Sequence, residues 1–277
     1  MTRSRGQGSE PEQTATHSGE TGRAPFNVDG VRVTVDADRQ SMGRAAATIA
    51  AGAIREAIRV RGKARVVFAA APSQSETLAA LASRDDIEWR RVEAFHMDEY
   101  VGLDPTAPQA FGQWLRDHLF DQVDLGRVAL IDPTASPEAE AARYGDLVTA
   151  ESIDLVCLGI GENGHIAFNE PHQAHIADQR SARVVDLDLD SLNQQVSDGL
   201  FNTADDVPAT AITLTVPTLL SARTLVGSIP GSSKATAVAT ALSGPISTAC
   251  PASFLRRHDS VHLHLDTEAA AYLDIGP

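Results

Sequence analysis

Short apolar runs that alternate with helical patterns restrict the fold of this chain more than any other feature. Four runs stand out: Val66–Ala71, Val92–Met97, Ile153–Leu158 and Thr224–Ile229. Strands with few polar positions are buried on both faces, which is typical of a parallel sheet. Each run therefore predicts a strand with helices packed on either side of it.

Helix-forming patterns separate these runs along the chain. We expect helices over Ser41–Arg59, Ser73–Ser83, Phe111–Phe120, Pro137–Thr149 and Gly231–Leu242, and further strands over Val31–Val35, Val128–Ile131, Val184–Asp190, Ala211–Val216 and Val261–Leu265. The alternation predicts an α/β fold with a single doubly wound, mostly parallel sheet and helices on both faces. Acidic and apolar residues alternate over 184–190, which predicts a half-exposed edge strand.

Composition defines the ordered part of the chain and argues against two classes of partner. Residues 1–25 are almost wholly polar and predict a disordered N-terminal tail, while 26–277 predict one domain. The net charge of −14 disfavours nucleic acid and anionic membranes, because both would repel it. No run approaches the roughly 18 apolar residues of a membrane span, and no apolar signal segment is seen. We expect a cytoplasmic protein, and the sequence leaves open whether it forms a homo-oligomer.

The strand predicted over 153–158 continues into a glycine-rich turn. Gly159, Gly161 and Gly164 match the pattern G-x-G-x-x-G, but Pro171 would end the helix that a dinucleotide site needs. A dinucleotide site is therefore not expected. The glycines instead predict a tight turn whose backbone approaches a small ligand closely, which makes Gly161 and Gly164 candidate binding residues.

His165 ends this turn, and Glu170 follows five residues later. A histidine and a carboxylate above the carboxyl end of a sheet are typical of a proton-transfer pair. A hydrogen-bonded turn histidine without a chemical role is the simpler alternative for an isolated His. Because Asn163 and Glu170 lie nearby, we favour the functional interpretation and take Asn163, His165 and Glu170 as candidate catalytic residues.

A second candidate site follows the strand predicted over Val92–Met97. Asp98 and Glu99 stand at its carboxyl end. Paired acids at such a position can separate into one ionised base and one structural carboxylate. In the alternative interpretation, Asp98 caps the next segment and Glu99 is solvated. This stretch alone leaves both interpretations open.

Two strand-to-helix loops have the features of an anion site. Ala71, Ser73 and Gln74 lie at the start of a predicted helix, where free N–H groups and the helix dipole favour a phosphate. Ordinary N-capping by Ser73 explains this loop equally well. Lys234 is one of only two lysines and lies in the first turn of the helix predicted over 231–242. The dipole disfavours a cation there unless an anion binds, and a surface lysine is the alternative.

These four loops all lie at the carboxyl ends of strands, where open α/β sheets bind ligands. Together they predict a pocket for a small anion with acid and base groups beside it. No metal site is expected, because the scattered histidines lack the spacing of metal ligands; they are His118, His172, His175, His258, His262 and His264.

Two motifs resemble the glucosamine-6-phosphate deaminase/6-phosphogluconolactonase family of sugar-phosphate enzymes. They are Met-Asp-Glu-Tyr-Val-Gly-Leu within Phe95–Leu103 and Gly-Ile-Gly-Glu-Asn-Gly-His-Ile-Ala-Phe-Asn-Glu-Pro over Gly159–Pro171. The similarity extends from about Val31 to Tyr272. Both motifs are closer to the deaminase branch, since lactonases typically carry Asp-Gly-His-Thr-Ala-Ser at the second.

The resemblance implies a reaction and roles for the candidate residues. Deaminases open the sugar ring, move a proton from C2 to C1 and release ammonia, which gives a fructose 6-phosphate-like ketose. Asp98 would move the proton, and His165 would assist ring opening with Glu170 beside it. Lys234 and the loop 71–75 would hold the phosphate of a small amino sugar. No metal or organic cofactor is implied.

The chain departs from the family pattern at three places. Asn163 stands where many deaminases carry Asp, and the loop 71–75 replaces the usual Thr-Gly-Gly/Ser-Thr-Pro. The stretch Val196–Phe201 lacks the arginine with which the family binds phosphate. A lactonase that uses His165 to activate water, and a non-catalytic sugar-phosphate sensor, are the alternatives. The intact Met-Asp-Glu-Tyr-Val-Gly-Leu stretch argues against the lactonase, and the acid/base residues argue against the sensor. We therefore expect an amino-sugar-phosphate deaminase or isomerase, most simply one acting on glucosamine 6-phosphate.

Overall fold

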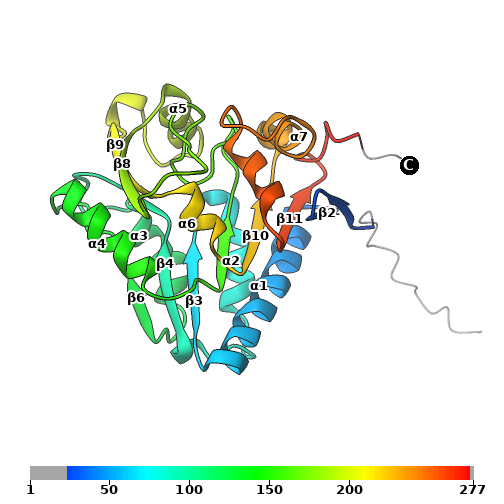
Figure 1. Cartoon of the computed structure of the whole chain (residues 1–277), viewed down its shortest axis with the longest axis horizontal. Coiled ribbons are helices and arrows are strands. Elements are labelled where there is room, and N and C mark those ends of the chain that lie inside the picture. The colour runs from blue at the N-terminus through cyan, green and yellow to red at the C-terminus, as the bar shows by residue number, and fades with distance from the viewer. Residues whose placement is uncertain (1–23, 275–277) are drawn as a thin grey trace, which may run out of the picture.

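The computed structural model describes residues 24–274, and its main feature is an eight-stranded sheet (Figure 1). The strands run in the order β1-β2-β11-β10-β7-β3-β4-β6, and every neighbouring pair except β1–β2 is parallel. The prediction of a mostly parallel sheet is therefore confirmed. The strands are β1 Phe26–Val28, β2 Val31–Asp36, β3 Ala64–Phe68, β4 Val92–His96, β6 Arg127–Ala129, β7 Leu155–Leu158, β10 Thr224–Ile229 and β11 Val261–Asp266.

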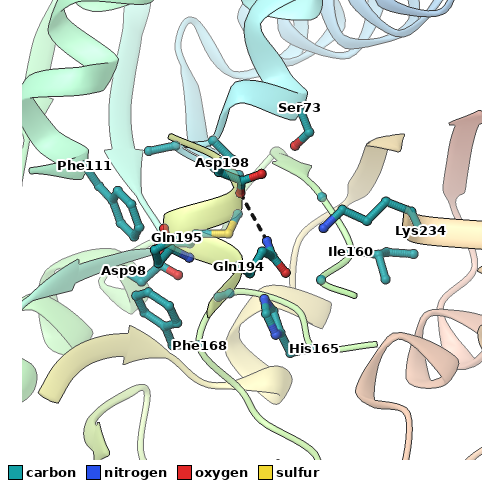
Figure 2. Close-up of a pocket in the computed structure, with 17 residues that line it drawn as sticks. Ser73, Asp98, Phe111, Ile160, His165, Phe168, Gln194, Gln195, Asp198 and Lys234 are labelled. Atoms are coloured by element: carbon teal, nitrogen blue, oxygen red, sulfur yellow. Dashed lines mark hydrogen bonds between the residues drawn. The ribbon is translucent and has the colours of Figure 1, made fainter. Parts of the chain in front are cut away.

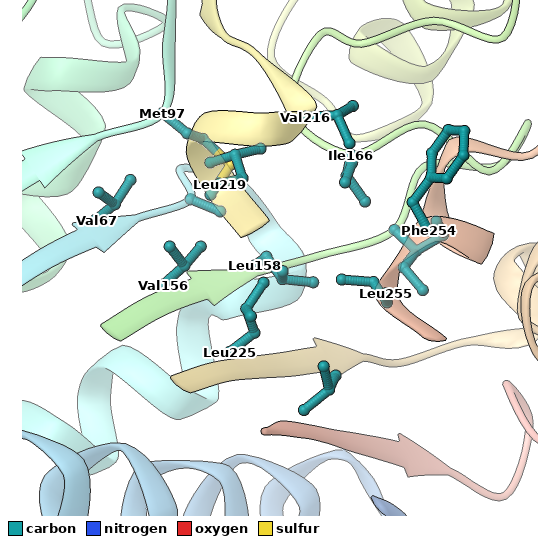
Figure 3. Close-up of a cluster of buried hydrophobic side chains, with 14 of the residues drawn as sticks. Val67, Met97, Val156, Leu158, Ile166, Val216, Leu219, Leu225, Phe254 and Leu255 are labelled. Atoms are coloured by element: carbon teal, nitrogen blue, oxygen red, sulfur yellow. The ribbon is translucent and has the colours of Figure 1, made fainter. Parts of the chain in front are cut away.

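Helices cover both faces of this sheet, as predicted. They are α1 Arg39–Arg61, α2 Ser75–Ala82, α3 Phe111–Leu115, α4 Pro137–Thr149, α5 Leu189–Ser197, α6 Val216–Leu220 and α7 Ala235–Ser243. Successive residues of β3 point to opposite faces: Val66 lies in one hydrophobic core with Ala50 of α1, whereas Val67 lies in the other with Leu219 of α6. Figure 3 shows part of this second core. The sheet is thus doubly wound.

α1 begins and ends where its sequence provides caps. The carboxylate of Asp38 accepts a hydrogen bond of 2.7 Å from the backbone N–H of Ser41, and the Ser41 hydroxyl accepts one from the backbone N–H of Asp38. Gly62 ends the helix with a φ of 79°, a left-handed conformation that glycine adopts without strain. These caps place a long, alanine-rich helix across the sheet.

Three further strands form a second, antiparallel sheet that the sequence did not predict. They are β5 Asp98–Tyr100, β8 Ala182–Asp186 and β9 Thr210–Leu214, in the order β5-β9-β8. The strands predicted over 184–190 and 211–216 belong here rather than to the main sheet, which corrects the assignment of all strands to one sheet. β8 does lie at an edge, as expected. β5 follows β4 after a single residue, so the chain passes from one sheet to the other at Asp98.

The loop after β3 also differs from its prediction. β3 ends at Phe68 rather than Ala71, and a 3-10 turn over Pro72–Gln74 precedes α2. Ser73 lies inside this turn, while Ala71 and Gln74 occupy the cap positions, so Ser73 makes no capping hydrogen bond. The expected N-cap is therefore wrong, and the Ser73 hydroxyl is available for another role.

Two expectations concern the ends of the chain and the membrane. The tail predicted over 1–25 lies almost entirely outside the described residues, so the domain boundary near residue 26 stays a prediction, although β1 begins there. Within residues 24–274, no helix combines the length and the apolar character that crossing a bilayer requires.

Figure 1 shows β8, β9 and α5 close together at one end of the molecule, and α5 follows β8 where no helix was predicted.

Candidate active site

A pocket lies at the carboxyl ends of β10, β7, β3 and β4, which are neighbours in the main sheet (Figure 2). Its empty volume, which includes space open to solvent, is about 610 Å³. The lining includes six residues predicted for the site: Ala71, Ser73, Asp98, Gly161, His165 and Lys234. The other predicted residues lie behind the lining and contact or adjoin it: Gln74, Asn163, Gly164 and Glu170. The structure thus brings all four loops together.

Asp98 begins β5 and lies beside Phe111 and Phe168 in the pocket wall (Figure 2). It is only 6% exposed, and because it lies in a strand it caps no helix. Burial, and then the neighbouring charge of Glu99, raise the pKa of Asp98 well above its ordinary value. A carboxyl group with a raised pKa is suited to take a proton and return it.

Glu99 is buried, in contrast to the solvated position considered from the sequence. Its carboxylate accepts hydrogen bonds from the backbone N–H groups of Tyr100 at 3.0 Å, Phe111 at 3.1 Å and Gly112 at 2.8 Å. Burial raises the pKa of Glu99 to about 7, although the three donors act in the opposite direction. These bonds hold the start of α3 against β5 and thereby place Phe111 in the pocket wall.

Two glycines allow the turn after β7 to present His165. A Cβ atom at residue 161 would lie 2.2 Å from Cε1 of the His165 ring, so only glycine leaves room for the imidazole. Gly164 has a φ of +87°, and a Cβ atom there would lie 2.6 Å from Sγ of Cys250. Residues 166–181 form turns rather than a helix, which agrees with the effect expected of Pro171 on a helix here.

A buried hydrogen-bond network lies behind the His165 ring. Glu170 is fully buried, and its Oε2 lies 3.6 Å from Nδ1 of His165. Asn163 donates from Nδ2 to the Glu170 carboxylate at 2.8 Å and accepts from the backbone N–H of His165 at 3.0 Å. Burial raises the pKa of Glu170, but His165, Ser191 and Asn163 together outweigh it and lower the pKa to about 2. Glu170 is therefore an ionised anchor.

Ser191 sets the tautomer of His165. Its hydroxyl donates to Oε1 of Glu170, and its oxygen lies 3.2 Å from Nδ1 of His165. Since the one hydroxyl proton goes to the carboxylate, the oxygen accepts the Nδ1–H of the imidazole. Nε2 of the neutral ring then carries a lone pair that can take a proton on the pocket side. Ser191 had no signal in the sequence.

Lys234 is 7% exposed and points into the pocket (Figure 2). Its Nζ has no hydrogen-bond partner among the described residues, and the nearest acidic oxygen, Oε1 of Glu162, is 3.9 Å away. Burial lowers the pKa of Lys234 against the attraction of Asp198 and Glu162. A buried ammonium group with no hydrogen-bond acceptor is costly. Lys234 is thus not the surface lysine of the alternative, and an anion in the pocket would offset this cost.

Ser73 faces the same space from the loop after β3. The amide of Gln74 donates from Nε2 to Oγ of Ser73 at 3.1 Å and to the carbonyl oxygen of Ser228 at 3.0 Å. Gln74 is only 1% exposed, so it supports the loop rather than lining the pocket. The Ser73 oxygen accepts from Gln74, which leaves its hydroxyl proton free for a ligand.

α5 provides a wall that the sequence did not reveal. Gln194, Gln195 and Asp198 line the pocket from one face of this helix and its end. Oε1 of Gln194 accepts the backbone N–H of Glu162 at 3.1 Å, and Oε1 of Gln195 accepts the hydroxyl of Tyr100 at 2.9 Å. In the sequence, only the helical spacing of these residues could have indicated this wall, because single glutamine side chains belong to no recognisable motif.

The groups in the pocket suit proton transfer on a small anionic molecule. Within residues 24–274, no three His, Cys, Asp or Glu side chains are grouped so that they could hold a metal ion. Asp98 and the imidazole of His165 can each accept a proton, while Lys234 and Ser73 offer donors to an anion. These groups can carry out acid/base chemistry.

Residues 37–263 match the family of glucosamine-6-phosphate isomerases/6-phosphogluconolactonase. The chain belongs to this family. The family membership predicted from the two motifs is thus confirmed. Among relatives of this family member, the glucosamine-6-phosphate deaminase of Exiguobacterium sibiricum is 37% identical over 191 residues, which cover 69% of this chain and 74% of the relative.

Solved structures of both branches of the family share the fold. A monomeric glucosamine-6-phosphate deaminase superposes with a TM-score of 0.80 at 30% identity, covering 87% of this chain and 99% of that one. The 6-phosphogluconolactonase of Trypanosoma brucei superposes with a TM-score of 0.72 at 19% identity, covering 89% and 100%. At 19% identity, the second similarity concerns the fold alone.

Proposed function

We propose that this family member is an amino-sugar-phosphate deaminase that converts glucosamine 6-phosphate to fructose 6-phosphate and ammonia. The observation that carries this proposal is that Asp98, His165 and Lys234 reach one pocket from the ends of three different strands. The reaction needs a base for carbon-bound protons, a group that opens the ring and a cation for the phosphate. The relatives named as glucosamine-6-phosphate deaminases support the same assignment.

His165 opens the pyranose ring in this proposal. Nε2 of the neutral imidazole removes the proton of the C1 hydroxyl, the C1=O bond forms, and the bond from C1 to the ring oxygen breaks. The imidazolium then gives its proton to the ring oxygen. Glu170 stabilises the imidazolium, and Ser191 holds the ring in the tautomer that exposes Nε2.

Asp98 moves the proton from C2 to C1. Its carboxylate removes the C2 proton while the C1=C2 bond forms. The substrate's own ammonium group on C2 supplies the proton that the C1 oxygen takes. Asp98 then returns its proton to C1, and the nitrogen lone pair forms a C2=N bond. Water adds to C2, ammonia leaves, and the ketose remains. The raised pKa of Asp98 makes its carboxylate a stronger base towards the C2 proton.

Lys234 and Ser73 hold the phosphate and so fix the sugar relative to the acid/base groups. Lys234 contributes a charge without a hydrogen-bond partner among the described residues, and Ser73 contributes a free hydroxyl proton. Binding at the phosphate orients C1 and C2, which lie several bonds away. Orientation of this kind contributes to the rate by lowering the entropy cost of reaching the reactive geometry.

A coupled ammonia-release assay tests the proposed function. The substrates are glucosamine 6-phosphate, galactosamine 6-phosphate and their N-acetylated forms, and we expect ammonia and ketose in equal amounts from glucosamine 6-phosphate. Absence of both ammonia release and isomerisation with all of these substrates would contradict the proposal. Hydrolysis of 6-phosphogluconolactone, measured in parallel, would instead assign the protein to the lactonases.

A further inference from the structure

The end of the pocket that holds Lys234 carries more negative than positive charge. Asp198 lines the pocket here, and the carboxylate of Glu162 lies 3.9 Å from the Lys234 ammonium. Among the described residues, Lys234 is the only lysine or arginine that lines this pocket. One ammonium group with two carboxylates nearby is a poor match for a phosphate dianion, because the net charge that the dianion meets is negative.

The neutral residues of α5 do not compensate for this charge. The amide of Gln194 has one contact with Asp198, Nε2 to Oδ2 at 3.4 Å, and no described residue donates a hydrogen bond to Oδ1 (Figure 2). Gln195 uses its Oε1 for the hydroxyl of Tyr100. The half-buried Asp198 therefore presents a carboxylate oxygen without a donor among the described residues to a pocket that would receive phosphate oxygens. Two acceptors in contact repel each other unless a proton lies between them.

We propose, building on the assignment of a phosphorylated substrate, that Asp198 and the substrate phosphate share one proton in the complex, so that this end of the pocket selects a phosphate ester over an anion that cannot carry that proton. The proton lies either on the phosphate, as its monoanion, or on Asp198. In both cases a short O–H···O bond replaces the contact between two acceptors. The proton comes from solvent, and no other bond is made or broken.

The groups around Asp198 are consistent with this proton. Lys234 faces it from the segment before α7, Glu162 and His165 from the glycine turn, and Gln194 from its own helix. Burial raises the pKa of Asp198, and Glu162 acts in the same direction, while Lys234, Gln194 and His165 lower it. A phosphate ester has its own second pKa near 6. Burial thus favours the protonated form of Asp198, and the phosphate ester can itself carry the proton.

Glucosamine 6-sulfate is the probe that isolates the proton. The sulfate ester carries one negative charge, like a phosphate monoanion, but it has no proton to share. We expect kcat/KM for the sulfate to be about 10- to 150-fold below that for the phosphate in the wild type, the range for one hydrogen bond between charged groups. In Asp198→Asn, whose amide can donate to either ester, the ratio should approach one, and Asp198→Ala should behave in the same way if the carboxylate is the cause.

Glu162→Gln is the matched control, because Glu162 is a second carboxylate near Lys234 that does not line the pocket. This variant should keep the discrimination between the two esters. Equal discrimination in the wild type and in Asp198→Asn would overturn the proposal. Loss of discrimination in Glu162→Gln to the same extent would also overturn it, since general charge repulsion would then be sufficient.

Calorimetry with glucitol 6-phosphate counts the proton directly and does not depend on turnover, because this alditol has no carbonyl group. Titrations in buffers of different ionisation enthalpy should give uptake of up to one proton, and Kd should rise towards tenfold per pH unit above pH 7. Asp198→Asn should flatten this dependence. A slope that persists in Asp198→Asn would assign the titration to Lys234 and overturn the proposal. Binding with proton uptake but no deaminase activity would refute the proposed reaction alone.

Discussion

Replacing Lys234 with methionine should increase stability and decrease substrate binding at the same time. The Lys234 ammonium is buried without a hydrogen-bond partner among the described residues, and methionine fills similar space without the charge. A buried polar group without a partner costs about 1–3 kcal/mol. The lost attraction to Asp198 and Glu162 offsets part of this gain, and the Glu162 part is small because its side chain is 43% exposed. We therefore expect the free energy of unfolding to rise by at most about 3 kcal/mol.

The same substitution removes the cation that meets the substrate phosphate. A hydrogen bond to a charged group contributes about 1.5–3 kcal/mol, which corresponds to a loss of about 10- to 150-fold in kcat/KM. The loss should fall mainly on KM, because the phosphate lies several bonds from C1 and C2. A substitution that raises stability and lowers activity is expected where a buried binding group destabilises the folded protein.

Thermal unfolding and steady-state kinetics test both parts. A gain of 1 kcal/mol should raise Tm by roughly 2–4 °C for a domain of this size. Lys63→Met is the matched control, because the Lys63 side chain is 45% exposed and pairs with Glu151 at the surface. It should change stability by no more than about 0.5 kcal/mol and leave KM unchanged. A Lys234→Met variant that is less stable than the wild type and keeps its KM would refute this reasoning.

Four further substitutions test the acid/base groups. Asp98→Asn should lower kcat at least ~10²-fold, because an amide cannot take the C2 proton, and near-normal turnover would remove Asp98 from that role. Glu99→Gln should move the acid limb of the pH profile of kcat/KM to lower pH. The rate on this limb rises as Asp98 loses its proton, and burial and the Glu99 charge both raise the pKa of Asp98, so that removing the charge lowers this pKa. An unmoved limb would contradict this coupling. Gly161→Ala places a methyl group 2.2 Å from the His165 ring and should lower kcat by about 10²-fold, whereas an unchanged rate would show that the ring is not confined. Ser191→Ala removes the hydroxyl beside His165 and should lower kcat about tenfold with little change in KM; a main effect on KM would point to a general change of the pocket.

The main sheet was predictable because its central strands hold few polar residues. Val66, Val67 and Phe68 are all fully buried, as expected for a strand covered on both faces. The second sheet was not predictable, because β5 consists of only Asp98–Tyr100, and acids are depleted in strands. Its formation depends on antiparallel pairing with β9, more than 100 residues later in the chain.

The candidate site was predictable where chemistry and position coincide. Asp98 and His165 are acid/base residues in the segments that follow two apolar regions of the chain, and the carboxyl ends of parallel strands meet at one edge. Ser191 and Gln195 gave no such signal, because they lie on a polar helix that follows β8 where no helix was predicted, and because serine and glutamine are common residues. Their roles arise from contacts across the fold, such as the bond of Gln195 to Tyr100.

Ammonia release from glucosamine 6-phosphate tests the proposed reaction most directly. The purified wild-type protein should produce ammonia and fructose 6-phosphate in equal amounts, and Asp98→Asn should do so at least ~10²-fold more slowly. Hydrolysis of 6-phosphogluconolactone without any ammonia release, or ammonia release that is unaffected in Asp98→Asn, would contradict the proposed function or its mechanism, respectively.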